Sequence, residues 1–335
     1  MNLHQIGEFG LIEHLHSRLQ TRRGVRLGIG DDAAILDALR APIVTCDALI
    51  ENVHFRRDWT TPRALGRKAM SVNVSDIAAM GANPVAAFVA LAISENDDLN
   101  WIEELYGGME EVAARWNFTI AGGDTVRAPV TMISVTMIGE LAGEPILRSG
   151  AQIGDEILVT GTLGDAAAGL ALLQNPDVQL EKSARDFLLH RHHEPTPRLE
   201  EMHAALKVKC ADGTRALHAA LDLSDGSGGD GAHIAKSSNV SLEIFPAQLP
   251  ISNQCRAAAE TLKTDARDWA LRGGEDYELL LCVAPEKTDE VCDAIRGTGT
   301  RATRIGRCVA REESAAILVD ENNKRAAVRG AFEHF

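Results

Sequence analysis

One arrangement recurs along this chain and limits how it can fold. Apolar, strand-like segments end on an aspartate, as at residues 43–47, or lead into a turn that carries glycine and aspartate, as at residues 118–124 and 221–226. The same turn residues stand together in GIGDDAA at 28–34. Glycine lets a backbone approach a ligand closely or adopt positive φ, and strand ends in open sheets border ligand-binding crevices. The pattern, mixed with helical segments, predicts an α/β or α+β fold with sites at strand ends.

A chain of 335 residues is long for one ordinary core and suits two domains. We expect the boundary near residues 142–150, which gives an N-terminal domain at 1–145 and a C-terminal domain at 146–335. Helices are predicted near the N-terminus (Leu11, Leu15 and Leu19 are four apart), at 62–79 and at 101–116. Strands are predicted at 43–47, 84–93, 118–121, 130–141, 156–160, 221–224 and 277–283.

The charge balance narrows the possible partners. The formal net charge is −14, which disfavours nucleic acid because phosphate backbones require clustered lysine and arginine. An acidic protein can still hold polyphosphates when divalent cations lie between carboxylates and phosphate oxygens. No stretch reaches the roughly 20 apolar residues of a membrane span, so no membrane partner is predicted. Six scattered cysteines without a C-x-x-C pair are typical of reduced thiols and predict a cytoplasmic protein.

The aspartates are the candidate chemical groups. Five places stand out: Asp31/Asp32, Asp47, Asp76, Asp124 and Asp222/Asp225. If they converge, their repulsion calls for cations, and oxygen-only ligands favour Mg²⁺ bridging to phosphates. Each Gly-Asp pair taken alone is more often a simple turn. Neither a P-loop nor a complete dinucleotide-binding glycine motif is present in the sequence.

Histidines and aromatic residues carry less information. His190, His192 and His193 flank Arg191 and are more typical of a solvated helix face than of a metal site. His54 is a candidate substrate contact, seven residues after Asp47. Phe332 is either a core residue or a stacking surface for a flat ligand ring, and composition does not choose between the two.

Taken in order, the motifs resemble the thiamine-monophosphate kinase family, in the superfamily that contains aminoimidazole ribonucleotide synthetase. The matching segments are GIGDDAA (28–34), TCDALIENVHF (45–55), KAMSVNVSDIAAMGANP (68–84), AGGDTVR (121–127), VTGTLGDAAAGLALL (159–173), LDLSDGSGGDGAHI (221–234) and LRGGEDYELL (271–280). The resemblance covers nearly the whole chain. It implies a two-domain fold of the aminoimidazole ribonucleotide synthetase type, with an N-terminal mixed sheet that pairs in a homodimer and a C-terminal α/β domain that completes the active site.

The activity implied is transfer of the ATP γ-phosphoryl group to thiamine monophosphate, with several Mg²⁺ ions. The resemblance leaves open whether K⁺ is a further cation. The acceptor phosphate is largely deprotonated near neutral pH, so no strong general base is needed. Catalysis would rest on in-line positioning and charge neutralisation.

By the same resemblance, site roles fall on specific residues. Asp76, Asp124 and Asp225 are the expected catalytic residues. Metal ligands are expected at Asp32, Thr45, Cys46 (through backbone or side chain), Asp47, Asp76, Asp124, Asp222 and Asp225. ATP contacts are expected at Tyr106, Gly123, Arg148 and Ser224, and thiamine monophosphate contacts at His54, Glu275 and Phe332.

Two departures from the family pattern stand out. Cys46 replaces the usual threonine or serine, and Ser227 replaces an aliphatic residue, which predicts a more flexible turn. Two other functions are alternatives to the kinase. One is another ATP-dependent synthetase of the superfamily, acting on an amide or carbonyl oxygen. The other is a non-catalytic protein that uses the aspartate turns only to bind cations.

Overall fold

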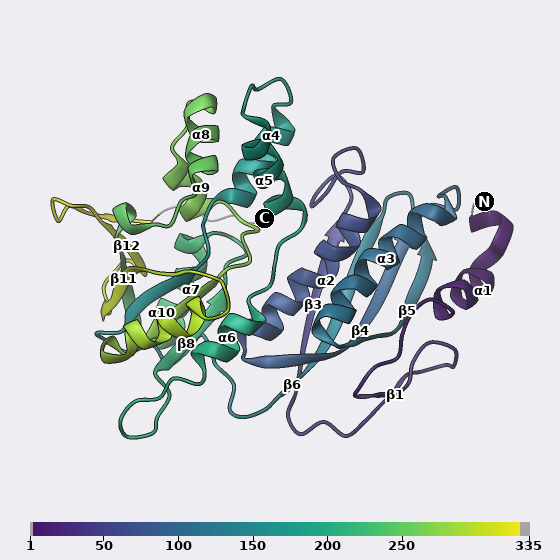
Figure 1. Ribbon diagram of the computed structural model, residues 1–335, viewed down its shortest axis with the longest axis horizontal. Coiled ribbons are helices and arrows are strands. Elements are labelled where there is room, and N and C mark those ends of the chain that lie inside the picture. The colour runs from purple at the N-terminus through teal and green to yellow at the C-terminus, as the bar shows by residue number, and fades with distance from the viewer. Residues whose placement is uncertain (1–2, 329–335) are drawn as a thin grey trace. The chain divides into compact units, whose positions relative to one another are not determined.

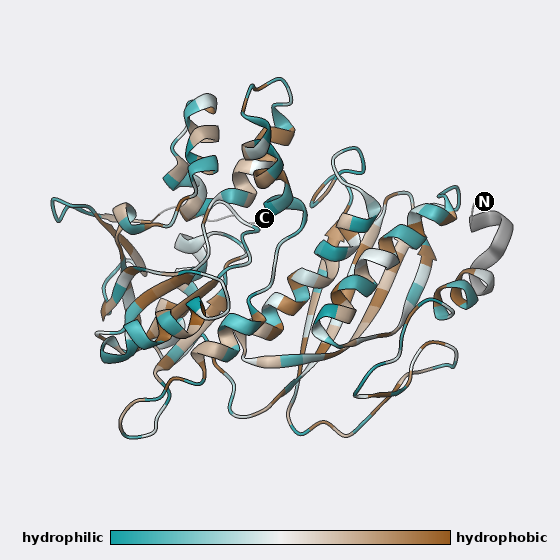
Figure 2. Cartoon of the chain, viewed as in Figure 1, coloured by the Kyte–Doolittle hydropathy of each residue, from teal (hydrophilic) through white to brown (hydrophobic). Residues whose placement is uncertain are grey.

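The computed structural model describes residues 3–328, with side chains from residue 10 onward. The chain divides into two compact units. The N-terminal unit comprises residues up to 77 together with 82–144, and the C-terminal unit comprises 78–81 and the residues from 145. In Figure 2 the strands of both units are mainly brown or pale, and the connecting loops are mainly teal. Among the described residues no helix is long and apolar enough to cross a membrane.

The N-terminal unit is built on a four-stranded sheet of order β3-β6-β4-β5, in which only the β4–β5 pair is parallel. A two-stranded antiparallel sheet, β1-β2, stands apart from it. The elements are α1 (Leu3–His16), β1 (Val25–Leu27), β2 (Ile35–Leu36), β3 (Pro42–Ile50), α2 (Pro62–Ala79), β4 (Ala82–Ile93), α3 (Leu99–Trp116), β5 (Thr119–Arg127) and β6 (Met132–Leu141).

Helices α2 and α3 cover one face of this sheet, as Figure 1 shows. Their apolar residues, among them Met70 and Leu105, pack against Val89 and Val135 of the strands. The two helices can approach closely because residue 66 is a glycine. A Cβ at that position would collide with the Leu105 carbonyl. Helix α3 begins at Leu99, two residues before the predicted start, because the Asp98 carboxylate caps it by accepting a hydrogen bond from the Asn100 amide.

The opposite face of the sheet is partly uncovered along β3 and β6. Residues of β3 alternate between exposed and partly buried, and Val44 is 64% exposed. The strand predicted at 43–47 is present, but its apolar residues do not make it a buried strand, because β3 is an edge strand that is covered on one face only. A second difference concerns β5, which continues through Gly122, Gly123 and Asp124 to Arg127 instead of ending at Ala121. Parallel pairing with β4 along this whole length keeps the glycines extended.

The C-terminal unit contains a seven-stranded sheet of order β13-β12-β9-β11-β7-β10-β8, in which only β12 and β9 pair in parallel. Its elements are β7 (Glu156–Thr160), α4 (Asp165–Gln174), α5 (Lys182–His193), α6 (Leu199–Ala205), β8 (Leu217–Asp222), α7 (Ser227–Ser238), β9 (Val240–Ile244), η1 (Pro246–Gln248), α8 (Asn253–Leu262), α9 (Ala266–Arg272), β10 (Leu279–Val283), η2 (Pro285–Lys287), α10 (Thr288–Arg296), β11 (Ala302–Ala310), β12 (Ala316–Val319) and β13 (Arg325–Ala327).

Helices lie on both faces of this sheet. Alternate residues of β7 show the reason, since Ile157 and Val159 enter the core shared with α4, α5, α7 and α8, while Leu158 enters the core shared with α6 and α10. A strand covered on both faces is apolar on both, which matches the apolar run at 157–159. All six cysteines are free thiols. Together the two units confirm the predicted α/β (α+β) class.

Candidate functional site

The N-terminal unit brings three predicted site residues together. Thr45 and Asp47 lie two apart on β3, so both side chains point to the face that α2 covers. Asp76 comes from the last turns of α2, and its carboxylate accepts a hydrogen bond from the Thr45 hydroxyl. Burial raises the pKa of Asp47 to about 6, and the neighbouring Asp76 adds to the shift. Two carboxylates that share one half-buried place are the arrangement that a cation relieves.

Cys46 lies between these residues in sequence but not in space. Its side chain points to the uncovered face, where the sulfur lies 3.5 Å from the Ser134 hydroxyl and 3.4 Å from that of Thr136. The thiol therefore does not face Asp47 and Asp76. A contact between Cys46 and an ion at that cluster would have to use the backbone carbonyl.

Asp124 lies at the other edge of the sheet, and the segment that contains Asp32 approaches that edge through Gly28. Asp124 is an exposed residue of β5, and the GIGDD segment approaches the same strand, with Gly28 beside Ala121. Strands β3 and β5 are the two edges, so Asp47 and Gly123 are separated by three strand spacings, about 14 Å. Within residues 3–328 no three histidine, cysteine or acidic side chains form a group able to hold a metal ion. The full predicted ligand set stays a prediction.

The other predicted residues of this unit lie in different surroundings. His54 follows β3 in a turn, where its Nδ1 accepts a hydrogen bond from the Ile50 amide. Gly123 is in β5. Tyr106 is only 7% exposed in the core, and burial raises the pKa of its phenol. Phe332 lies outside the described residues.

The C-terminal unit gathers a second set of predicted residues at the end of β8. Asp222 closes the strand, and the Ser224 carbonyl accepts a hydrogen bond of 2.8 Å from the Glu275 amide. This contact needs Gly274, since a Cβ there would lie 2.5 Å from the Ser224 carbonyl oxygen. Glu275 has a left-handed backbone, with φ of 68°. A non-glycine residue held in this region is uncommon and is frequent at functional sites.

Asp230 is a site residue that the sequence analysis did not single out. Its carboxylate accepts a hydrogen bond of 2.9 Å from the Asp225 amide, which holds the turn after β8. Burial raises the pKa of Asp230 to about 6, and the nearby Arg148 guanidinium partly opposes that shift. The signal was present in the sequence, because Asp230 lies in the same 221–234 motif as Asp225.

The interpretation of the histidines at 190–193 as a solvated helix face is wrong for His192. The side chain of His190 is 60% exposed, as a solvated helix face requires, but that of His192 is buried and its Nδ1 lies 3.2 Å from a Glu275 oxygen. The helical period turns these neighbours to different sides of α5.

The expected flexibility of the turn at Ser227 is also wrong, because the buried Ser227 hydroxyl donates a hydrogen bond to the Ala270 carbonyl.

Glu278 anchors the strand that follows this loop. It is fully buried and accepts hydrogen bonds of 2.6–2.7 Å from Arg191, Arg198 and Thr160. Burial opposes its ionisation, but the two guanidinium groups and the hydroxyl keep the pKa of Glu278 below its usual value. The Glu278 carbonyl in turn accepts a hydrogen bond from the Leu223 amide. The loop with Glu275 and the end of β8 are thus held by one buried charge cluster.

Comparisons with known proteins agree with this architecture. Residues 30–141 match the family AIR synthase related protein, N-terminal domain, and residues 152–319 match AIR synthase related protein, C-terminal domain. The thiamine-monophosphate kinase of Bacillus subtilis is 35% identical over 333 residues, which cover 98% of this chain and 99% of that protein.

Solved structures give the same result. The thiamine-monophosphate kinase of Stenotrophomonas maltophilia has a TM-score of 0.80 at 36% identity, covering 93% of this chain and 96% of that one. A structure described as AaThiL complexed with AMPPCP and TMP has a TM-score of 0.77 at 32% identity, covering 100% and 99%.

The fold and the two domain matches define an AIR synthase related protein. Within that class, this chain belongs to the thiamine-monophosphate kinase family, whose members are phosphotransferases. The resemblance drawn from the motifs is confirmed.

Proposed function

We propose that this chain transfers the γ-phosphoryl group of ATP to the phosphate of thiamine monophosphate, with Mg²⁺, giving thiamine diphosphate and ADP. An acceptor phosphate oxygen forms the new P–O bond while the bond from the γ-phosphorus to its bridging oxygen breaks, and the electron pair leaves with ADP. The observation that carries the proposal is the carboxylate pair of Asp47 and Asp76 beside Thr45, in a chain related over its full length to thiamine-monophosphate kinases.

The residues present fit a magnesium ion. Mg²⁺ in phosphoryl-transfer sites is commonly held by one or two carboxylates together with substrate phosphates, so the Asp47–Asp76 pair suits this ion. Asp32, Asp124, Asp222 and Asp225 would supply further ligands. Bound Mg²⁺ neutralises charge that develops on the phosphoryl oxygens.

The chain's own groups would orient the two substrates. Arg148, Gly123, Ser224 and Tyr106 are proposed to contact ATP. Glu275 is proposed to face the cationic thiazolium ring of the acceptor, with His54 and Phe332 as further contacts. The pairing of Glu275 with His192 supports a positioned carboxylate in this role.

We further propose a homodimer formed through the uncovered face of the N-terminal sheet, where Val44, Cys46 and Ala48 of β3 are exposed. The free thiols support a cytoplasmic location.

The test is ADP release from ATP and Mg²⁺, with and without thiamine monophosphate and K⁺, followed by chromatography of the products. Thiamine diphosphate formed in step with ADP is the expected result. Asp76→Asn should lower kcat at least a hundredfold while the protein stays folded. ADP release that depends on an aminoimidazole precursor, and not on thiamine monophosphate, would replace the proposal with a synthetase activity.

A further inference from the structure

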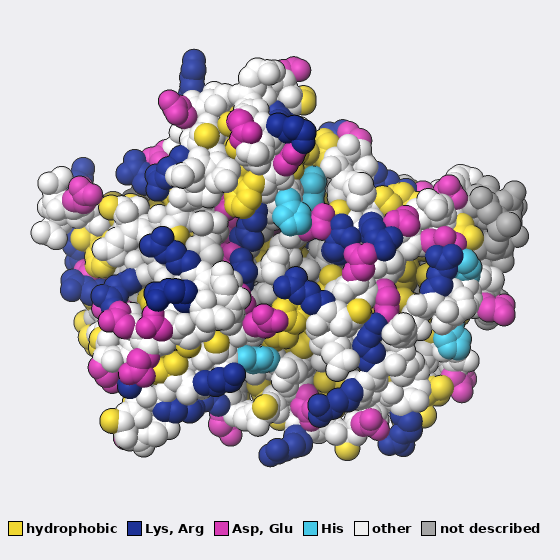
Figure 3. Space-filling model, in the orientation of Figure 1, with side chains coloured by type: hydrophobic (Ala, Val, Ile, Leu, Met, Phe, Trp, Pro, Cys, Tyr) yellow, Lys and Arg dark blue, Asp and Glu magenta, His cyan; other side chains and the backbone are white. Residues whose placement is uncertain are grey.

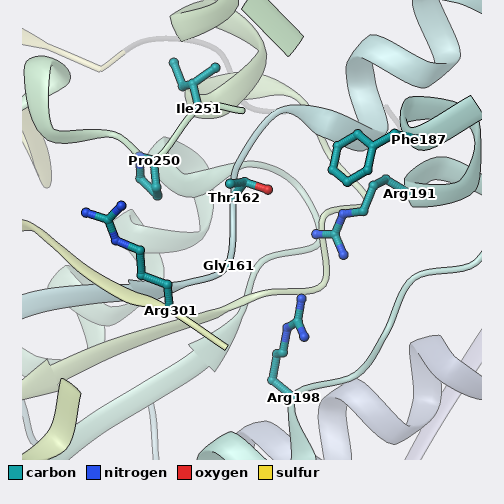
Figure 4. A pocket seen from close by; sticks show the side chains of 8 residues that line it. All are labelled: Gly161, Thr162, Phe187, Arg191, Arg198, Pro250, Ile251 and Arg301. Atoms are coloured by element: carbon teal, nitrogen blue, oxygen red, sulfur yellow. The ribbon is translucent and has the colours of Figure 1, made fainter. Parts of the chain in front are cut away.

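A cavity in the C-terminal unit is lined by none of the residues discussed above as substrate or metal contacts. Its volume is about 330 Å³, and its walls include three arginines, Arg191, Arg198 and Arg301, together with apolar side chains. Figure 4 shows Arg191 and Arg198 pointing toward one another, with the ring of Phe187 beside Arg191. Arg301 lies on the other side of Thr162.

Arg191 and Arg198 are held in place before any ligand arrives. Both side chains are 12% exposed, and each donates to Glu278 Oε1, at 2.7 Å and 2.6 Å. Because one carboxylate serves two guanidinium groups, part of the positive charge is left uncompensated by this contact. The Nε atom of Arg191 is buried without a hydrogen-bond partner. A preorganised guanidinium group loses little freedom when an anion binds.

Two further acids offset part of this excess, since Asp165 Oδ2 lies 3.9 Å from Arg191 Nε and Glu201 pairs with Arg198. Glu201 is engaged by Arg198 at 3.6 Å and by the Thr300 hydroxyl. Burial raises the pKa of Asp165, and it raises that of Asp276 to about 8, so Asp276 is mainly protonated at neutral pH. Arg301 is exposed and forms no hydrogen bond or ion pair through its side chain within residues 3–328.

The walls indicate what else a ligand would carry. The apolar part of the lining is made by Phe187, Pro250 and Ile251. Guanidinium groups match the oxygens of a phosphate, and an aromatic wall favours a flat apolar group. The combination is therefore suited to a phosphate attached to a ring.

We propose that this cavity is a second ligand site, which binds a small phosphate monoester carrying a flat apolar group. The inference does not rest on the proposed kinase activity. The site is distinct in sequence from Arg148 and the aspartate turns, so it can be tested separately from them.

The test is isothermal titration calorimetry of the full chain in magnesium-free buffer, with inorganic phosphate and phenyl phosphate as probes. We expect both to bind, phenyl phosphate more tightly, with affinity falling as salt is raised. Arg301→Gln should weaken both probes about tenfold, since one charge-assisted contact is lost. Phe187→Ala should remove most of the preference for phenyl phosphate.

Two matched variants decide where the probes bind. Arg256→Gln changes an exposed arginine of the same unit outside the cavity and should leave both affinities unchanged. Arg148→Gln should also leave them unchanged. Equal weakening by Arg301→Gln and Arg256→Gln would show non-specific attraction, and loss of binding in Arg148→Gln alone would place the anion at the proposed ATP site. Either result, or no binding of either probe, overturns the proposal.

Discussion

At the scale of single residues, the Asp47–Asp76 pair shows how the sequence creates a local conflict. Alternation along β3 directs Asp47 and Thr45 to the helix-covered face, and α2 delivers Asp76 to the same place. Burial there disfavours the charged form of Asp47. The conflict would be costly in a purely structural role, and a bound cation would remove it.

This conflict predicts a pH dependence of stability in chelator-treated protein. The pKa of Asp47 is raised to about 6 in the folded state, so the folded state binds more protons than the unfolded state between the two pKa values. The free energy of unfolding should fall by ~2 kcal/mol as pH rises from about 4 to 6, allowing for partial exposure. Urea unfolding of wild type and Asp47→Asn checks this, since the variant should lose that slope. An unchanged slope would remove Asp47 as its source.

Cys46 supplies a contrasting prediction one residue away. Its thiol points to the opposite face from Asp47. Cys46→Ser should therefore keep kcat and the Mg²⁺ dependence within about twofold, while Asp47→Asn should reduce turnover by two orders of magnitude or more. Steady-state kinetics over a range of Mg²⁺ concentrations make the comparison. A large Mg²⁺ shift in Cys46→Ser would contradict the placement of the side chain.

At the scale of elements, the loop between α9 and β10 depends on buried charge. Glu275 and Tyr277 both have positive φ, of 68° and 50°, which costs free energy that the surroundings must supply. The hydrogen bond from the Tyr277 amide to the Leu223 carbonyl, and the Glu278 cluster just beyond, hold that conformation. The strain is thus placed beside the proposed acceptor contact.

Glu278→Gln tests this anchor. It leaves the two guanidinium groups without their shared carboxylate, which should destabilise the protein by about 3–5 kcal/mol. Thermal unfolding gives the measurement. Glu290→Gln is the control, since Glu290 forms an exposed pair with Lys287 and should change stability by less than ~1 kcal/mol. Equal losses of stability in Glu278→Gln and Glu290→Gln would show that Glu278 does not anchor the loop.

At the scale of the whole molecule, the two units each carry their own core and part of the predicted site. Basic and acidic side chains are interspersed over the face seen in Figure 3, so that face carries no extended patch of one sign. What distinguishes the N-terminal unit is the exposed face of β3 and β6. An uncovered apolar sheet face is a common interface between copies of a chain.

The homodimer prediction follows from that face. Val44→Glu places a charge where an apolar side chain is 64% exposed, and should convert a dimer to a monomer in sedimentation velocity. Ile153→Glu is the matched control, because Ile153 is 68% exposed in the C-terminal unit and should leave the dimer intact. A monomeric wild type, or a Val44→Glu protein that remains dimeric, would exclude this interface.

The sequence by itself determined the fold class, the three helices and four main-sheet strands of the N-terminal unit, and the family. Helix α2 was predicted at its observed bounds because Thr61-Pro62 is a strong local start signal and Gly81 a stop signal. Such start and stop signals act over a few neighbouring residues, so the sequence alone shows where the helix begins and ends. The motifs likewise contained nearly every residue of the proposed site.

Only the tertiary structure decided which of those residues meet. Pairing order made β3 and β5 opposite edges, which separates Asp47 from Asp124 although both follow the same local pattern. Packing of α5 buried His192 against Glu275 and exposed His190. The cavity with Arg191, Arg198 and Arg301 draws on segments more than 100 residues apart. Contacts of this range depend on the packing of whole layers, because no local propensity encodes which distant segments will share a surface.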